Sequence, residues 1–403
     1  MELSILLGSG FSAPAGLPLV SDINNVMRSL QKENFWINLN KNAGFFSPND
    51  GNKDPNNVFF FNRLFAQDWI NFYCNEKLNN ISDFNYEVFY DYNIDVTRYG
   101  KDEELTKNFC EVFRTKWSVF QNIGDNNLIN DFLKIYQQLI GSLLIKPEFE
   151  QGVSYGSYSC NSGFFRLIQK LIADGIVNVH TLNHDIFFEH VMKFYDSVGD
   201  NFSDGFSELG SNIYGQAIVP FEFQGQRIER TYTVRLPMYT GEYNGKLRLY
   251  KLHGSVDNYY MLDGQQTRFK RQPGINSFKV ESISSSEGKL YYQPVLENLN
   301  PDFLTGTTTK VQQYDSHFYN NLLSHFKRNL SLSSCLLVIG YGFCDPGINE
   351  ILQSDYLSHG KRMAIVDVRQ PEADLVALYP KQMTFFTKGI DIISYDELEQ
   401  LIN

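Results

Sequence analysis

Two side chains that could take part in catalysis follow strand-like segments of the chain. His253 stands in KLHGS, where a segment of alternating residues ends at a glycine. The pKa of imidazole suits general base catalysis near neutral pH. Asn183 stands in TLNHD, after the apolar residues 176–180, and its neutral side-chain amide can orient a water molecule. A lone histidine at a strand end is usually structural, so the prediction of a catalytic His253 depends on the other motifs expected beside it.

A glycine-rich segment, GSGFSAPAGLP, follows the apolar residues 3–7. Gly8, Gly10 and Ala13 fit the dinucleotide pattern G-x-G-x-x-G/A, in which glycines let the backbone approach a pyrophosphate. The prolines and glycine of residues 14–18 predict that no helix starts at once, and the acidic residue expected about 20 positions further on is absent, which disfavours an ordinary dehydrogenase. A tight turn without a ligand is the alternative.

A second glycine-containing segment, VIGYGFCDPGINEIL, comes late in the chain. Asp345 and Pro346 suit the N-cap and first position of a helix, so a structural role explains both. The free N–H groups and positive dipole end of that helix would face the ligand, and we expect Gly340, Tyr341 and Gly342 to contact it.

Two carboxylates follow predicted strands. Asp185 could cap the next helix or hold a ribose hydroxyl, and both roles stay open. Asp367 ends the apolar segment MAIVD and could accept hydrogen bonds from an adenosine ribose. His180 and His184 are four positions apart, but a strand-to-helix transition does not keep that spacing on one face, so we expect no metal site.

The elements that must position these residues are read from the apolar pattern. Residues 3–7, 176–180, 335–339 and 363–367 are nearly continuous apolar runs, as expected for strands covered by helices on both faces. Helical periodicity alternates with these runs, which predicts an α/β fold with a doubly wound, Rossmann-like parallel sheet. Because the carboxyl ends of parallel strands meet at one edge, the motifs should lie together there.

Two insertions interrupt the expected core. Residues 48–150 show helical periodicity with many aromatic residues, and residues 202–300 show mainly strands and turns and include the His253 strand. The core is therefore expected at 1–47, 151–201 and 301–403. Two capped helices are also predicted: one has Ser21 as its N-cap and an apolar stripe through Ile23, Val26, Met27 and Leu30, and the other has a capping box of Ser394 and Glu397.

Charge and cysteine content limit the partners. The 403 residues carry a formal net charge of -11, so neither nucleic acid nor an anionic membrane is an expected partner. The five cysteines contain no C-x-x-C pair, which favours a reducing compartment. No apolar run approaches the ~18–20 residues of a membrane span, and we expect a cytoplasmic protein without a cleaved leader.

Four segments, taken in chain order, resemble the signatures of the sirtuin superfamily: GSGFSAPAGLP, TLNHD, KLHGS and VIGYGFCDPGIN. These signatures are a glycine-rich loop with GIP, a T-x-N-x-D strand end, an HG pair and a late glycine turn. The set is most similar to the bacterial sirtuin-like proteins of antiphage defence. Deacylating sirtuins also have two C-x-x-C pairs that hold zinc and an arginine after GIP, whereas this chain has no such pair and reads Leu19-Val20-Ser21 there. This departure from the deacylase pattern therefore implies no zinc.

The resemblance also implies roles for individual residues. His253 would be the catalytic base and Asn183 would position the attacking water. The ligand-binding residues would be those of the pyrophosphate loop (Gly8, Ser9, Gly10, Ser12), those at the nicotinamide ribose (Asn183, Asp185) and those at the adenosine half (Gly340, Tyr341, Gly342, Asp367).

The implied activity is that of an NAD+ glycohydrolase (NADase), which cleaves NAD+ to nicotinamide and ADP-ribose and acts as a regulated effector that depletes NAD in antiphage defence. NAD is then a substrate. A homo-oligomer and a partner ATPase or phage-derived trigger are expected, and the aromatic-rich residues 58–146 are the better candidate for such contacts, although aromatics equally favour a core. The alternatives are a non-catalytic sensor of NAD or ADP-ribose and a protein deacylase or ADP-ribosyltransferase.

Overall fold

The computed structural model describes most of the chain, in fourteen segments: residues 2–28, 35–38, 43–46, 58–100, 103–144, 160–192, 198–224, 226–261, 267–271, 275–283, 290–294, 301–304, 317–371 and 374–403. The chain forms two compact units. One comprises Met1–Leu17, Ile145–Phe303 and Tyr314–Asn403, and the other comprises Pro18–Leu144 and Leu304–Gln313.

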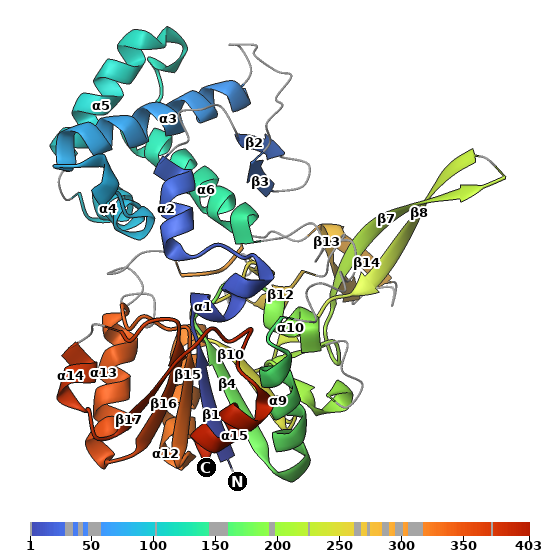
Figure 1. Ribbon diagram of the computed structural model, residues 1–403. Coiled ribbons are helices and arrows are strands. Elements are labelled where there is room, and N and C mark those ends of the chain that lie inside the picture. Colours follow the sequence, from blue (N-terminus) through green and yellow to red (C-terminus); the bar gives the residue numbers. More distant parts are fainter. Residues whose placement is uncertain are drawn as a thin grey trace. The chain divides into compact units, whose positions relative to one another are not determined.

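The first unit contains a seven-stranded sheet in which every pairing is parallel (Figure 1). Its strands, in spatial order, are β17 (Met383–Thr387), β16 (Arg362–Asp367), β15 (Cys335–Ile339), β1 (Glu2–Leu7), β4 (Ile176–Thr181), β10 (Leu247–Lys251) and β5 (Phe202–Ser203). The chain proceeds from β1 to β4 and β10 and then returns to β15 on the other side of β1. The order therefore reverses between β1 and β15, which is where doubly wound sheets bind their ligands. The predicted fold class is confirmed.

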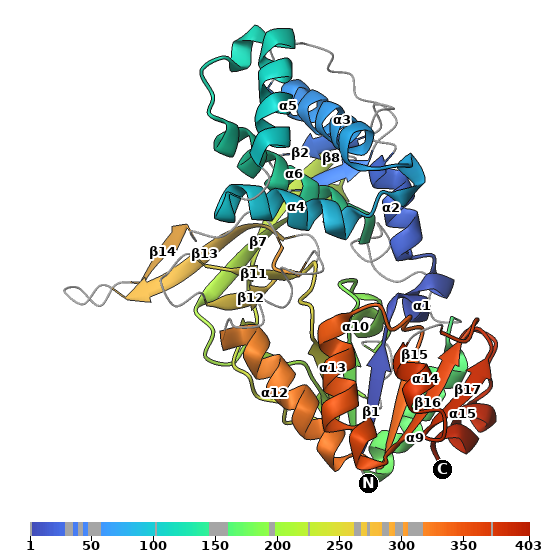
Figure 2. The ribbon, with the colours of Figure 1, turned by 90° about the vertical axis from the view of Figure 1, so that its left-hand side faces the viewer.

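Helices cover both faces of this sheet, as the apolar strands require. Helices α9 (Ser162–Asp174) and α15 (Tyr395–Ile402) lie on one face, and α12 (His317–Leu332) and α13 (Pro346–Asp355) lie on the other (Figure 2). A shorter helix, α14 (Asp374–Leu378), connects β16 to β17. The predicted capping box of Ser394 and Glu397 is present at the start of α15.

The segment after β1 differs from the sequence expectation. A one-turn helix, α1 (Ser9–Ser12), begins directly after Gly8 and continues as a 3-10 turn, η1 (Ala13–Ala15). The prediction that no helix starts at once is therefore wrong. Pro14 is accommodated because it lies in the first turn of η1, where its missing N–H has no intrahelical partner to lose. Gly16, with φ of +75°, then ends the turn in a left-handed conformation.

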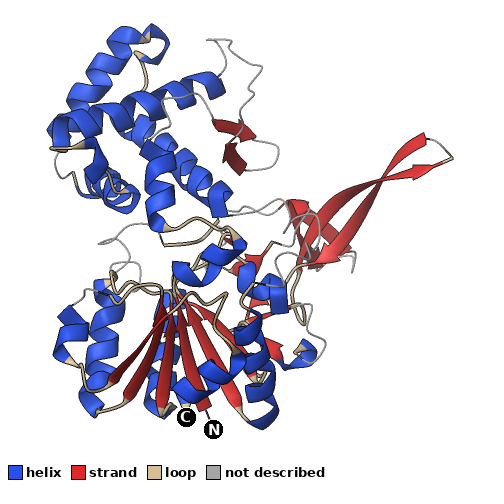
Figure 3. Cartoon of the chain, viewed as in Figure 1, coloured by secondary structure: helices blue, strands red, loops and turns tan. Residues whose placement is uncertain are grey.

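The second unit is mainly helical where the structure describes it (Figure 3). Its elements are α2 (Val20–Arg28), the hairpin of β2 (Phe35–Asn38) and β3 (Ala43–Phe46), α3 (Val58–Lys77), α4 (Tyr86–Tyr99), α5 (Glu103–Lys116) and α6 (Asp125–Leu144). The expected N-cap Ser21 is wrong: it lies inside α2, and the Asp22 carboxylate instead accepts the Leu19 N–H. Leu30 lies outside the described residues.

Many aromatic residues of this helical unit form its own core. The Trp69 ring is fully buried, with its centroid 4.7 Å from that of Phe109 and 6.0 Å from that of Phe89. Its indole N–H donates to Asn93 Oδ1 at 2.7 Å, so the polar atom of the ring is satisfied inside the core. These aromatic residues are therefore used in internal packing.

The strand-rich residues 202–300 supply β5 and β10 to the parallel sheet and also form two antiparallel sheets. One sheet contains β11 (Asn258–Tyr260), β12 (Arg268–Lys270), β9 (Met238–Tyr239) and β6 (Phe206–Ser207). The other contains β14 (Leu290–Pro294), β13 (Ile275–Ile283), β7 (Ile213–Phe223) and β8 (Gln226–Arg235). Across the described parts of the chain, no helix has the length and apolar character to cross a bilayer.

Candidate functional site

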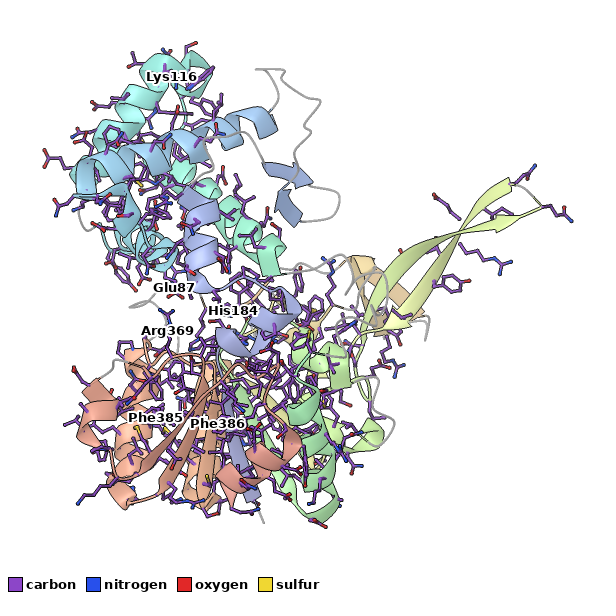
Figure 4. All side chains as sticks on the ribbon, in the orientation of Figure 1. Glu87, Lys116, His184, Arg369, Phe385 and Phe386 are labelled. Atoms are coloured by element: carbon purple, nitrogen blue, oxygen red, sulfur yellow. The ribbon has the colours of Figure 1, made fainter. Side chains whose placement is uncertain are left out.

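The strand register brings the sequence motifs to one edge of the parallel sheet. Leu7, the last residue of β1, is paired with Thr181 of β4 and with Ile339 of β15, and Thr181 is paired with Lys251 of β10. The glycine loop, TLNHD, the HG pair and the second glycine segment therefore all leave the sheet at its carboxyl edge. His184 lies at this edge in Figure 4.

Asn183 is held in one orientation. Its Nδ2 donates to the Gly8 carbonyl oxygen at 2.9 Å and to Ser12 Oγ at 3.0 Å, and its backbone N–H donates to Thr181 Oγ1 at 3.0 Å. A carbonyl oxygen can only accept, so the amide nitrogen must face Gly8. Both amide hydrogens are thus used internally. The carbonyl oxygen Oδ1 is the part of this side chain that could accept a hydrogen bond from a water or a ribose hydroxyl.

Ser12 and Asp185 belong to the same hydrogen-bonded group. Ser12 is only 2% exposed, and its hydroxyl bonds to the Asp185 carboxylate as well as to Asn183. Asp185 Oδ1 also accepts the N–H of Phe187, the first residue of α10 (Phe187–Met192). Burial raises the pKa of Asp185, and the nearby Lys251 ammonium and these hydrogen bonds oppose that rise. Asp185 thus satisfies the first N–H of α10, which fits the capping role that is one of its two expected roles, and Ser12 links two buried side chains.

A buried ion-pair cluster joins the β4 and β10 ends. Lys251 Nζ lies 3.1 Å from Glu189 Oε1 and donates to the Asp185 carbonyl oxygen. Lys270 Nζ lies 3.8 Å from the same Glu189 oxygen and 2.6 Å from Asp204 Oδ2. Burial raises the pKa of Glu189, while the two ammonium groups favour its ionised form. The sequence motifs did not predict this cluster, although the lysine in KLHGS at the end of a buried strand was a usable signal.

His253 is buried and faces a carboxylate. Its Nε2 lies 3.2 Å from Asp345 Oδ2, and its ring centroid lies 6.1 Å from that of His184. Gly254 follows with φ of +76°, and a Cβ atom there would lie 2.6 Å from the Tyr319 hydroxyl. The glycine of the HG pair is therefore required by the turn that places His253.

Asp345 has a second role that sequence analysis did not find. Its Oδ1 accepts the Ile348 N–H at 3.0 Å, which confirms the predicted N-cap of α13, while its Oδ2 contacts His253. Its backbone carbonyl also accepts the Asn349 N–H. The Asp345 carboxylate therefore takes the Ile348 N–H at the start of α13. The contact joins strand β10 to helix α13, so no local spacing in the sequence could have revealed it.

Tyr341 supports the loop before α13. Its hydroxyl lies 2.9 Å from Asn349 Oδ1 and accepts the Asp345 N–H at 3.3 Å, and its ring packs 4.8 Å from that of Phe343. The side chain is 6% exposed. Its ring and hydroxyl are therefore engaged within the loop, in place of the ligand contact expected from the sequence.

Three of the predicted ligand-binding glycines pack against one another. The N–H groups of Gly8 and Gly10 donate to the carbonyl oxygens of Ile339 and Gly340 at 2.9 and 3.0 Å. A Cβ atom on Gly10 would lie 2.7 Å from the Gly340 Cα, and Gly340 itself has φ of +61°. These glycines let the loops after β1 and β15 cross, and the two N–H groups are not available to a pyrophosphate. By contrast, a Cβ atom on Gly342 would meet only Cys344 Sγ, at an ordinary 3.7 Å, within the described chain.

The other predicted site residues occupy the same edge. Ser9 is the half-buried first residue of α1. Asp367 is half-buried at the end of β16 and accepts the Arg369 N–H at 3.2 Å.

His180 lies on the sheet face covered by α12. Its Nε2 is 3.5 Å from Asn329 Nδ2, and its ring stacks 4.8 Å from Tyr250. Burial, with a contribution from His325, lowers the pKa of His180 to about 3, so this ring is neutral at physiological pH. Within the described segments, no group of three or more His, Cys, Asp or Glu residues could hold a metal ion.

No protein-family model and no curated protein sequence matches the chain. Among solved structures, the chain is similar to one described as "Sir2-p53 peptide-NAD+", with 11% identity, a TM-score of 0.38 and coverage of 99% of this chain and 92% of the other. It is also similar to a Sir2 homolog–NAD complex, with 9% identity, a TM-score of 0.36 and coverage of 99% and 89%.

Proposed function

We propose that this protein is an NAD+ glycohydrolase, which cleaves NAD+ to nicotinamide and ADP-ribose. The observation that carries the proposal is the placement of Asn183 and His253. They follow neighbouring strands, β4 and β10, at the carboxyl edge of the sheet, and both side chains are buried and held by hydrogen-bonding partners. The ordered motifs resemble those of NAD-consuming sirtuin-like proteins, and they meet beside the reversal of strand order, where doubly wound sheets bind ligands.

In this mechanism the bond between ribose C1′ and the nicotinamide nitrogen breaks, and the departing nicotinamide takes the bonding electron pair. The ribose becomes oxocarbenium-like, and a water oxygen forms the new bond to C1′. Asn183 Oδ1 accepts a hydrogen bond from that water and orients it, because the amide nitrogen is already engaged by Gly8 and Ser12. His253 accepts the proton from the water or from a ribose hydroxyl. The products are nicotinamide, ADP-ribose and one proton.

The residues assigned to the rest of NAD+ are fewer than the sequence suggested. In this proposal Ser9 at the start of α1, Gly342 and Asp367 would contact the ligand, and Asp367, at the end of β16, would accept a hydrogen bond from a ribose hydroxyl. Gly8, Gly10 and Gly340 act by bringing the two loops together.

The sequence resemblance extends the proposal to the protein's biological setting. The enzyme would be a cytoplasmic effector of bacterial antiphage defence that depletes NAD+. It would form homo-oligomers and would be activated by a partner ATPase or a phage-derived trigger protein. No zinc would be needed for the reaction.

The test is nicotinamide release from NAD+ by the purified full chain, without an added acceptor and over a range of protein concentrations. Loss of a well-placed base costs ~10²–10⁴-fold in rate, so His253→Ala and Asn183→Ala should nearly abolish release. His359→Ala is the matched control, because His359 is exposed on the 3-10 turn η7 (Leu357–His359). Near-normal release by both site variants would refute the proposal.

Two other outcomes point to other functions. NAD+ binding without turnover at any concentration, with affinity unchanged in His253→Ala, would indicate a sensor of NAD or ADP-ribose. Release that requires an added acyl-lysine peptide or an acceptor protein would indicate a deacylase or an ADP-ribosyltransferase.

A further inference from the structure

We infer that Asp345 is a positioning residue for His253, and that it holds the imidazole in the tautomer that carries its proton on Nε2. This inference rests on the proposed function for its catalytic consequence. The contact itself is a property of the fold, and it can be tested without any substrate.

The geometry of the contact is well defined. Asp345 Oδ2 lies 3.2 Å from His253 Nε2, and the two side chains are only 12% and 4% exposed. A carboxylate accepts hydrogen bonds and donates none, so Nε2 must carry the hydrogen in this contact. The lone pair of the neutral ring is then on Nδ1, which is the nitrogen that can take a proton.

The carboxylate is itself fixed from several directions. Its second oxygen accepts the Ile348 N–H at 3.0 Å, so it cannot rotate away from His253 without uncapping α13. The Asp345 N–H donates to the Tyr341 hydroxyl, which is held in turn by Asn349 Oδ1 at 2.9 Å. Asn349 Nδ2 donates to the Phe343 carbonyl oxygen at 2.7 Å and completes the support.

The contact has a chemical consequence for proton transfer. When an O–H group of water or ribose gives its proton to Nδ1, the ring becomes an imidazolium with a proton on each nitrogen. The Asp345 carboxylate stays ionised and stabilises this cation through the Nε2–H hydrogen bond. The His184 ring also lies near His253, with its centroid 6.1 Å from that of His253 and 4.8 Å from that of Phe303.

Asp345→Asn is the decisive substitution. Asparagine is as good an N-cap as aspartate, so Oδ1 can still accept the Ile348 N–H. The other position then carries an amide N–H in place of the carboxylate oxygen, and this donor favours the His253 tautomer with its proton on Nδ1. In a serine protease the same change costs about 10⁴-fold in kcat because the histidine adopts the wrong tautomer. We expect a fall in kcat of ~10²–10⁴-fold with KM for NAD+ changed much less.

The direct readout is the ¹⁵N–¹H spectrum of the histidine rings, which distinguishes the two tautomers. We expect His253 to carry its proton on Nε2 in the wild type and on Nδ1 in Asp345→Asn. Asn349→Ala is the control for loop damage, because it removes support without touching His253, and it should leave the Nε2–H tautomer in place. Asp345→Ser provides a second capping variant if Asp345→Asn does not fold, and it should give a mixture of tautomers.

Each result bears on the inference. An unchanged tautomer in both Asp345 variants overturns it, as does a kcat within a few-fold of wild type in both. If His253→Ala and Asn183→Ala release nicotinamide at near-normal rates but the tautomer changes as expected, the proposed function fails while the positioning role of Asp345 stands.

Discussion

The Asn183→Asp substitution tests the orientation of the Asn183 side chain. The new carboxylate is nearly isosteric with the amide, but it has no hydrogen to donate to the Gly8 carbonyl oxygen or to Ser12 Oγ. The Ser12 hydroxyl can rotate to donate, but it already bonds to Asp185. The Gly8 carbonyl cannot donate at all. The variant therefore loses two hydrogen bonds and adds a second buried carboxyl group beside Asp185.

The expected cost follows from these contacts. Two hydrogen bonds contribute ~1 kcal/mol each to the free energy of unfolding, and the unpaired buried charge adds to the loss, for a total of ~2–5 kcal/mol at neutral pH. Asn183→Ala loses the same hydrogen bonds without adding a charge, so it should cost about 2 kcal/mol.

The two variants should differ in their pH dependence. Burial without a positive partner raises the pKa of the new carboxyl group in the folded state above its unfolded value of about 4. The extra destabilisation is therefore full above the folded pKa and disappears as pH falls toward the unfolded pKa. Asn183→Ala should show no such change relative to wild type.

The assay is urea unfolding at about pH 5 and about pH 8, followed by circular dichroism. Tryptophan fluorescence is a useful reference because Trp36, Trp69 and Trp117, the three tryptophans, all belong to the helical unit and not to the unit that holds Asn183. If Asn183→Asp is as stable as the wild type at both pH values, the Asn183 amide does not face Gly8 and Ser12, and the assignment of Oδ1 to the attacking water fails.

Two further predictions test the surroundings of the site. Gly10→Ala should lower the free energy of unfolding by ~1–3 kcal/mol, because its Cβ atom would lie 2.7 Å from the Gly340 backbone. Gly342→Ala should leave the thermal midpoint nearly unchanged. Equal midpoints for the two variants would refute the loop-crossing explanation. Lys251→Met should lower the free energy of unfolding by ~3–5 kcal/mol at neutral pH, because the Glu189 charge loses its ammonium partner at 3.1 Å. Burial already raises the pKa of Glu189, so this loss should shrink as pH falls through that pKa and the carboxyl group protonates. Thermal melts of Lys251→Met across pH check this dependence, and a stability loss that does not change with pH would contradict it.

The features predicted correctly were those set by short stretches of chain or by general rules of topology. The apolar runs identified β1, β4, β15 and β16, and the shared carboxyl edge of parallel strands placed Asn183 and His253 together. The sequence did not predict the start of α1 because proline and glycine usually break helices, although Pro14 lies in a first turn that tolerates it. The His253–Asp345 contact was missed because it joins segments that only the fold brings together.

A glycine pattern in a sequence can identify the right positions without showing why glycine is needed there. A glycine is needed wherever a Cβ atom would collide, and a pyrophosphate or a second backbone can equally be the colliding group. At Gly10 and Gly340 the neighbour is another loop of the same chain, with atoms as close as 2.7 Å to the missing side chain of Gly10. At Gly342 the nearest described atom is 3.7 Å away, so internal packing does not require glycine there. A substitution tolerated for stability but not for NAD+ turnover is therefore expected at Gly342 and not at Gly10.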